Sequence, residues 1–365
     1  MMEKRGTSFL PLHYGKPPEI LYKKIVEMTG YISEIICQTY GTKRFIELLS
    51  DPVWFHSLSL VTGFDWNSSG TTTTTLHALK DYSKKKDLSF FVAGGKGKHM
   101  KNKRSEILNE SQFINSNSIA VRLIHDTDLV AKIDSNLLQD GYDLYIHSVV
   151  SDYSGNYSVV QQGMNPEHGM ARRYHWGALP DKLNDVERRK GINSDGMEKN
   201  VLDLSSPLSR DTRNSMLKVI KEKPHLSSGA QSSLDSFMGE KVLNMAVRMP
   251  WEKLKLIYEF EPADMENLLL LNGVGKSAIR ALCYISEVIM GAKPSREDPV
   301  RYSFAVGGKD GIPKPVNHKD YDAALSFFSE ILRTSGIERD KRIRLISGLS
   351  KYSMEKTGYT IIAEK

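Results

Sequence analysis

The stretch Met265–Ile285, MENLLLLNGVGKSAIRALCYI, decides the fold of the C-terminal part of the chain. The segments on either side of its centre carry apolar residues at helical spacing. At the centre, Gly273-Val274-Gly275 predicts a tight turn, because a glycine backbone adopts conformations that a Cβ atom disfavours. The stretch therefore predicts two helices joined by a short glycine hairpin.

The residues around this turn favour an anion-binding role. The amide groups of Gly275 and Lys276 open the second helix, and the N-terminus of a helix attracts phosphate through its free N–H groups. Lys276 and Arg280 lie one helical turn apart and could contact neighbouring phosphates, while Val274 would pack between the helices. The stretch resembles the helix-hairpin-helix motif, which implies sequence-independent binding of the DNA backbone. The alternative is an ordinary corner between two packed helices.

The rest of the chain predicts two domains of different character. Helical patterns dominate from Gly239 onward, so we expect residues 239–365 to form a helical domain that carries the hairpin. Residues 224–238 are polar and read as a linker, and residues 1–223 mix helix and strand patterns. The predicted fold class is α+β: an N-terminal mixed α/β domain with a small sheet and hairpin, then a C-terminal all-α helix-hairpin-helix domain.

The clearest strand signals flank Ser154-Gly155 and predict a β-hairpin. Its strands would be Tyr142–Asp152 and Tyr157–Met164, paired so that His147 faces Gln162 and Val150 faces Val159. Upstream, the apolar run Leu129–Asp134 reads as a buried strand.

Charge is unevenly distributed over the 365 residues, whose formal net charge is +6. Residues 84–104 alone hold eight basic residues and one acidic residue, a pattern that indicates an anionic partner such as nucleic acid. Within this window lies Gly94-Gly-Lys-Gly-Lys98, where exposed amides and ammonium groups favour phosphate contact. The alternative is a solvated basic loop. The candidate contact residues are Gly94, Gly95, Lys96 and Lys98.

A second set of cations lies beside aromatic residues in Arg172-Arg173-Tyr-His-Trp176. Mixed cationic and stacking groups are typical of surfaces that bind single strands, so Arg172 and Arg173 are further DNA-binding candidates. The alternative places Trp176 in the core.

Two aspartates bracket the turn before the predicted hairpin. Carboxylates at strand ends suit Mg²⁺ or Mn²⁺, so Asp134 and Asp140 are the candidate metal ligands. Such an ion could activate water for phosphodiester hydrolysis, with Lys132 stabilising charge on the phosphate. His147 and Gln162 would complete the catalytic set from the hairpin. The alternative is structural: turn aspartates often cap helices, and His147 with Gln162 could form a simple cross-strand pair.

Several segments together resemble a prokaryotic family catalogued as domain of unknown function 763. They are Leu10–Gly15, Ser50–Phe55, Gly63–Thr73, Val92–Lys98, Lys132–Tyr142, Val160–Met164, Ala171–Trp176 and Asp298–Gly311. The resemblance spans nearly the whole chain and implies no established chemistry. This chain has Val306 where the family often has histidine, so we expect no catalytic role at that position.

Three functions remain open from the sequence. The first is a DNA-processing enzyme, a metal-dependent nuclease whose hairpin grips the DNA backbone. The second is a DNA glycosylase, with Asp298 as the catalytic carboxylate after the hairpin. The third is a non-catalytic DNA-binding or scaffold protein.

The chain also lacks the signals of a membrane or secreted protein. No run of about 18 apolar residues occurs, and the N-terminus carries no apolar signal segment. Its two cysteines cannot form a disulfide framework. We therefore expect a cytoplasmic protein.

Overall fold

The computed structural model describes most of the chain up to residue 300. The described residues are 17–62, 69–85, 88–111, 117–167, 169–177, 189–194, 197–222 and 250–300. The predicted linker, the residues from 239 to 249 and those after 300 lie outside them. Within the described residues the protein is mixed α/β, as predicted.

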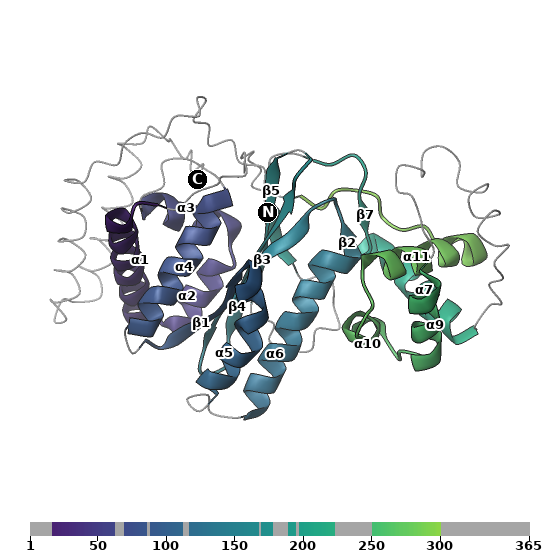
Figure 1. The fold of residues 1–365 in the computed structure, drawn as a ribbon, viewed down its shortest axis with the longest axis horizontal. Helices are drawn as coiled ribbons and strands as arrows, with labels where there is room; N and C mark the ends of the chain where they lie inside the picture. The colour runs from purple at the N-terminus through teal and green to yellow at the C-terminus, as the bar shows by residue number, and fades with distance from the viewer. Residues whose placement is uncertain are drawn as a thin grey trace, which may run out of the picture.

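A five-stranded antiparallel sheet forms the centre of the molecule (Figure 1). Its strand order is β1-β3-β4-β5-β6. The strands are β1 (Phe90–Lys96), β3 (Asp143–Asp152), β4 (Tyr157–Asn165), β5 (Met170–Trp176) and β6 (Arg189–Asn193). Side chains alternate between the two faces of the sheet, so each strand contributes to the apolar core on either side of it.

The β3–β4 hairpin is present, but its predicted register is wrong by one residue. Val149 pairs with Val159, and His147 pairs with Gln161 rather than Gln162. The turn is longer than predicted because Asp152 Oδ1 accepts from both Ser154 N and Asn156 N, each at 2.9 Å. Because side chains alternate along a strand, this slip places His147 and Gln162 on opposite faces of the sheet.

Four helices cover one face of the sheet. They are α1 (Glu19–Tyr40), α2 (Thr42–Leu49), α3 (Pro52–Val61) and α4 (Ser69–Lys85). Their apolar side chains form one core with the strand residues Phe90, Val92, Ile146, Val150 and Val160. In Figure 1 these helices lie to the left of the sheet.

The opposite face packs against α5 (Lys103–Glu110) and α6 (Asn117–Lys132). The short 3₁₀-helix η1 (Gly97–Asn102) precedes α5, and the π-helical turn η2 (Ile133–Leu137) ends α6. The predicted strand Leu129–Asp134 is therefore wrong: it is the end of α6 and the start of η2. A short apolar run carries no periodicity that separates a buried strand from a buried helix.

A second group of helices packs on the far side of α6 (Figure 1). It comprises α7 (Arg210–Glu222), α9 (Trp251–Phe260), α10 (Met265–Leu270) and α11 (Lys276–Met290), preceded by the 3₁₀-helix η3 (Pro207–Ser209). A two-stranded sheet of β2 (Leu138–Gln139) and β7 (Leu202–Asp203) lies beside them. Leu254, Leu268 and Leu282 from these helices belong to the same core as Val130 of α6 and Val159 of the sheet.

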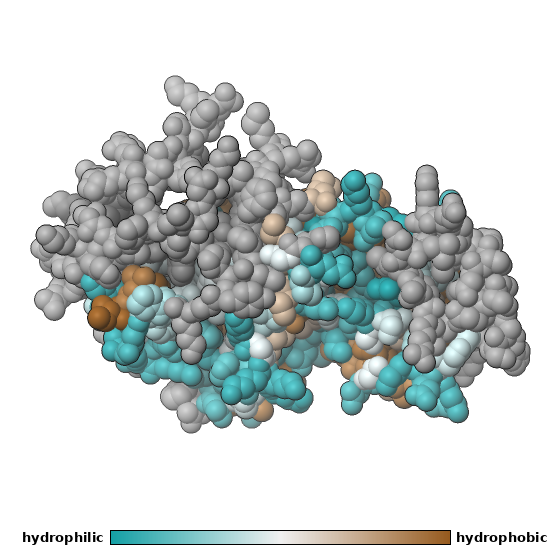
Figure 2. Space-filling model, turned by 45° about the horizontal axis from the view of Figure 1, so that its top comes forward, coloured by the Kyte–Doolittle hydropathy of each residue, from teal (hydrophilic) through white to brown (hydrophobic). Residues whose placement is uncertain are grey.

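In the view of Figure 2 the coloured atoms are mostly hydrophilic, with smaller apolar patches among them. None of the described helices is long and apolar enough to cross a bilayer.

Candidate functional site

The segment from α10 to α11 forms two helices around a tight turn, as predicted. Asp264 caps α10, because its Oδ1 accepts from Asn267 N at 2.8 Å. Gly273 has a φ of 86°, which side chains with a Cβ atom rarely adopt. Val274 is 2% exposed and lies in the core, so it fills the space between the helices.

The N-terminus of α11 is open at this turn. Gly275 is the N-cap and provides no side-chain cap, and a Cβ atom built on it would meet nothing within 4 Å. Gly273, Lys276 and Ser277 are exposed. The first N–H groups of a helix have no partner within the helix, so this N-terminus offers donors to an anion from solvent.

Several cations surround the turn. Lys276 Nζ lies 2.6 Å from Asp143 Oδ1, and both side chains are more than half exposed. A Cβ atom on Gly273 would lie 3.1 Å from Lys253 Nζ, so this exposed ammonium of α9 stands beside the turn. Arg280 Nε donates to Gln139 Oε1 at 2.6 Å. Lys132 Nζ donates to the Val274 carbonyl at 3.5 Å, which places Lys132 at the hairpin.

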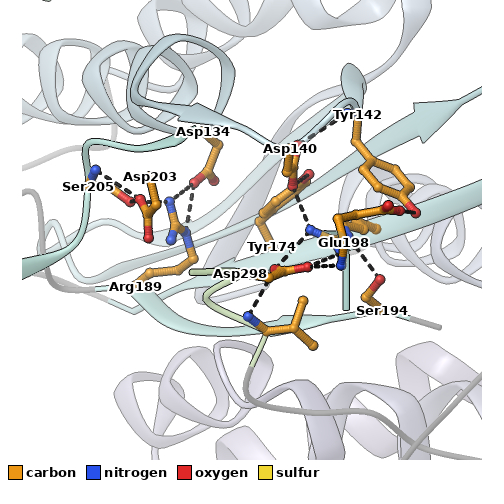
Figure 3. A network of polar contacts seen from close by, with 12 residues as sticks. Asp134, Asp140, Tyr142, Tyr174, Arg189, Ser194, Glu198, Asp203, Ser205 and Asp298 are labelled. Atoms are coloured by element: carbon orange, nitrogen blue, oxygen red, sulfur yellow. Dashed lines mark hydrogen bonds and ion pairs between the residues drawn. The ribbon is translucent and has the colours of Figure 1, made fainter. Parts of the chain in front are cut away.

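The predicted catalytic carboxylate Asp134 is fully buried, and both of its oxygens accept hydrogen bonds. Figure 3 shows its contact with Arg189. Arg189 donates to Oδ1 from Nε at 2.8 Å and lies 2.6 Å away through Nη2. Trp176 Nε1 and Gln161 Nε2 donate to Oδ2 at 2.7 and 2.5 Å. Burial raises the pKa of the Asp134 carboxyl, and the Arg189 guanidinium opposes that shift.

Asp140 and Asp298 share one buried cation, Arg172 (Figure 3). Arg172 Nη1 lies 3.0 Å from Asp140 Oδ2, and Nη2 lies 2.5 Å from Asp298 Oδ2. Tyr174 Oη also donates to Asp140, and Ser194 Oγ accepts from Arg172 Nε, both at 2.9 Å. These contacts join β5 to the residue that follows β2 and to the segment that follows α11.

This arrangement suits ion pairs better than a metal centre. The oxygens of Asp134 and Asp140 that would bind Mg²⁺ or Mn²⁺ already accept from arginine, tyrosine, tryptophan or amide groups. Among the described residues, no group of three histidine, cysteine or acidic side chains could hold an ion. The two aspartates also lie in separate ion pairs, so nothing here brings them together as joint ligands. Asp298 is likewise enclosed and does not resemble an accessible catalytic carboxylate.

The two catalytic residues predicted from the β3–β4 hairpin, His147 and Gln162, lie on opposite faces of the sheet. His147 Nδ1 lies 2.7 Å from Gln161 Oε1, and this pair leads to Asp134. Burial lowers the pKa of His147 to about 3, so the ring is neutral near pH 7. On the other face, Gln162 Nε2 donates to the Ser69 carbonyl at 3.0 Å.

The glycine-lysine loop begins inside the structure rather than on its surface. Gly94 N donates to Glu106 Oε2 at 2.7 Å, and Lys80 Nζ donates to the Gly94 carbonyl at 2.6 Å, so this amide is not available to phosphate. Lys96 and Lys98 are exposed, and Lys96 Nζ lies 5.6 Å from the centre of the Tyr145 ring. Gly95 has a φ of 142°, which favours glycine at that position.

Arg172 and Arg173 are both 0% exposed, not on the surface that their pattern predicted. They are neighbours on β5, so they point to opposite faces of the sheet. Arg172 joins the ion pairs above, whereas Arg173 faces α3 and α4.

The sequence did not point to three residues that complete these sites. Arg189 pairs with the buried Asp134, and Lys253 and Asp143 stand beside the α10–α11 turn. Arg189 lies in a polar stretch with no strand pattern, and its ion pair with Asp134 spans 55 residues. The pair of Lys276 with Asp143 spans 133 residues. Only Lys253 carried a local signal, as one of the cations on the helical segment just before the hairpin.

A family model matches residues 6–316 of the chain, and its description is "Protein of unknown function (DUF763)". No curated protein and no solved structure matches the chain. The family match covers all of the described residues, including the sheet, the buried ion pairs and the α10–α11 turn. The chain therefore belongs to the DUF763 family.

Proposed function

We propose that this protein binds the phosphate backbone of DNA at the turn between α10 and α11, acting as a helix-hairpin-helix motif. The observation that supports this most is the open N-terminus of α11, which carries no side-chain cap and stands among exposed cations. A helix dipole, free amides and nearby ammonium groups together favour a phosphate over any neutral ligand.

The ion pair of Lys276 with Asp143 is compatible with this role. Both side chains are largely exposed, and exposed ion pairs contribute little free energy. A DNA phosphate can therefore replace Asp143 as the partner of Lys276 at small cost. Lys253 of α9, whose ammonium stands beside Gly273, then supplies a second contact.

Backbone contacts of this kind read no sequence, so binding should depend on salt and not on base composition. We expect duplexes of unrelated sequence to bind the full-length protein with similar affinity, and the affinity to fall steeply as salt rises. Fluorescence anisotropy of labelled duplex and single-stranded DNA at several salt concentrations measures both properties.

A matched pair of variants locates the binding site. Lys276→Gln should weaken binding roughly three- to tenfold and lower the salt slope by about one, because one phosphate contact is lost. Lys43→Gln is the control, since Lys43 is also exposed in the first turn of a helix, α2, on the opposite side of the molecule. Equal affinity of wild type and Lys276→Gln would refute the proposed site.

DNA cleavage is a separate hypothesis that the same samples test. Metal-dependent cutting of undamaged DNA with Mg²⁺ or Mn²⁺ would support the nuclease predicted from the sequence. Metal-independent cutting at damaged bases, lost in Asp298→Asn but retained in an equally destabilised variant, would support the glycosylase. Salt-sensitive binding without any product would support the non-catalytic DNA-binding protein, which the buried and bonded state of Asp134, Asp140 and Asp298 favours.

A further inference from the structure

Arg173 is a buried cation without a carboxylate partner among the described residues. Its side chain is fully enclosed between β5, α3 and α4. The face of the guanidinium stacks 4.9 Å from the centre of the Phe55 ring, and Nη1 donates to Thr72 Oγ1 at 3.2 Å. Nε and Nη2 have no hydrogen-bond partner. These two nitrogens form one edge of the guanidinium, the edge that binds an oxyanion through two parallel hydrogen bonds.

Three further residues near this cation carry polar atoms without hydrogen-bond partners. His56 is 5% exposed, and neither of its ring nitrogens makes a hydrogen bond. His175 is fully buried, and its Nε2 has no partner, while its Nδ1 lies 3.2 Å from the Leu49 carbonyl. The centre of the His175 ring lies 5.4 Å from that of the Phe55 ring, on which Arg173 stacks, and His56 follows Phe55 in α3. Burial and the charge of Arg173 lower the pKa of both histidines. Gln162, which pairs with Arg173 across the strands, has an unpartnered Oε1.

The N-terminal end of α4 lies against the same group. Thr72, the partner of Arg173, stands in the first turn of this 17-residue helix. Gln162 Nε2 donates to the carbonyl of Ser69, the first residue of α4, and also to Tyr145 Oη. A helix N-terminus adds partial positive charge to a place that already holds an unpaired cation.

Without a bound ligand, this arrangement lowers the free energy of unfolding. Arginine keeps its proton in proteins, so it cannot avoid burial of its charge by becoming neutral. A buried charge without a partner costs several kcal/mol, and each unpaired buried polar atom adds to that cost. Each buried polar group without a partner calls for an explanation, and a bound anion would supply the missing partners of this guanidinium.

We infer that Arg173, His56, His175 and the first turn of α4 bind a phosphate group, as inorganic phosphate or as a terminal phosphate of a larger molecule. The guanidinium edge would hold two oxygens, and the neutral ring of His56 would donate one N–H to a third. His175 donates from Nδ1 to the Leu49 carbonyl, so its free Nε2 would accept from a protonated oxygen of the phosphate. A tetrahedral anion meets donors that converge from several directions, whereas a planar carboxylate would satisfy only the guanidinium edge. This site lies on the opposite face of the sheet from Asp134, and it is independent of the turn between α10 and α11.

The test measures thermal unfolding and calorimetric binding of the full-length protein in inorganic phosphate, with chloride and acetate at equal ionic strength as references. We expect a saturable rise in Tm with phosphate alone, because a ligand that binds the folded state stabilises it. Arg173→Gln should remove this rise. Arg104→Gln is the matched control, because Arg104 is exposed on α5.

A second variant covers the case in which Arg173→Gln fails to fold. His56→Phe keeps a ring of similar size and breaks no hydrogen bond of His56, so it should fold normally in phosphate-free buffer. It should weaken phosphate binding at least fivefold.

A short oligonucleotide with and without a 5′-phosphate separates the two sources of the phosphate group. Preference for the phosphorylated form assigns the site to a terminal phosphate of nucleic acid, and binding of inorganic phosphate alone assigns it to the free anion. Equal Tm values in phosphate and chloride, or a rise that survives both variants, would overturn the inference.

Discussion

Asp134 shows how a candidate catalytic carboxylate becomes a structural one. Its three hydrogen-bond donors come from β4, β5 and β6, so a single side chain on η2 connects three strands to the end of α6. Arg172, predicted as a DNA contact, also has a structural role: it joins Asp140 and Asp298, which lie 158 residues apart in the chain. These side chains connect the sheet to η2 and to the segment that follows α11.

Asp134→Ala should therefore destabilise the protein. The change leaves Arg189 as a buried cation without its partner, and breaking such a pair costs about 3–5 kcal/mol of the free energy of unfolding. Urea denaturation measures the loss. Asp211→Ala is the control, because Asp211 is exposed in the first turn of α7 and its removal should cost less than about 1 kcal/mol. A loss below 1 kcal/mol for Asp134→Ala would contradict a structural role.

Three buried histidines make stability depend on pH. Burial lowers the pKa of His56 and His147 to about 3 and that of His175 well below 6.5. The unfolded chain binds these protons near pH 6.5, so folding excludes them and the stability that is present above pH 6.5 falls as pH drops toward 3. Each histidine should contribute a slope of about 1.4 kcal/mol per pH unit.

Urea denaturation in phosphate-free buffer between pH 5 and 7.5 checks this dependence. His56→Phe should reduce the slope below pH 6 by about 1.4 kcal/mol per unit, since one titrating group is removed. An unchanged slope would mean that His56 is accessible to protons in the folded state.

At the level of single residues, local chemistry was predictable and long-range partners were not. The burial of Val274 and the positive φ of Gly273 follow from the Gly-Val-Gly pattern itself. The partner of Asp134 does not, because Arg189 reaches it only after the sheet has formed.

At the level of elements, the α10–turn–α11 segment and the β3–β4 hairpin were both located from their glycines. The register of the hairpin was not, because the side chain of Asp152 holds a longer turn than the backbone pattern implies. One residue of slip was enough to separate Gln162 from His147. The end of α6 was mistaken for a strand for a different reason: its apolar run is buried and too short to show a period.

The proposed DNA-binding element is the N-terminus of α11. Asp143 of β3 offsets the positive charge there, because it forms an ion pair with Lys276. Asp143→Asn should strengthen DNA binding, because it removes a competing carboxylate that lies 2.6 Å from Lys276 Nζ. We expect an increase of about two- to fivefold at low salt that disappears at high salt, where charge effects are screened. The control is Asp211→Asn on α7, which should leave affinity unchanged. Weaker binding by Asp143→Asn would contradict the proposed competition.

At the level of the whole molecule, the second helical group and the sheet share one apolar core. Leu282 of α11 is fully buried in the cluster that includes Val130 and Val159. The sequence predicted a helical C-terminal domain of its own, and the linker and the residues after 300 that would complete it lie outside the described residues. The shared core favours cooperative unfolding of the described parts.

Leu282→Ala should thus affect regions far from α11. Creating a cavity at this position should cost about 2–5 kcal/mol of unfolding free energy. Hydrogen–deuterium exchange should show faster exchange of β4 amides by a factor similar to that for α11. Val121→Ala is the control, because Val121 is 63% exposed. Faster exchange confined to α9, α10 and α11 would show that these helices unfold as a separate unit.

The most direct test of the proposed function is DNA affinity measured alongside stability for Gly275→Asp and Gly275→Asn. The position has room for a Cβ atom, and its φ of −135° suits any residue. Both side chains are good N-caps, so each should leave the free energy of unfolding unchanged or raise it by up to about 1 kcal/mol. Aspartate also places a negative charge where the phosphate would bind. We expect Gly275→Asp to fold as well as wild type and to bind DNA at least tenfold more weakly than Gly275→Asn does. Wild-type affinity in Gly275→Asp would show that α11 does not meet DNA.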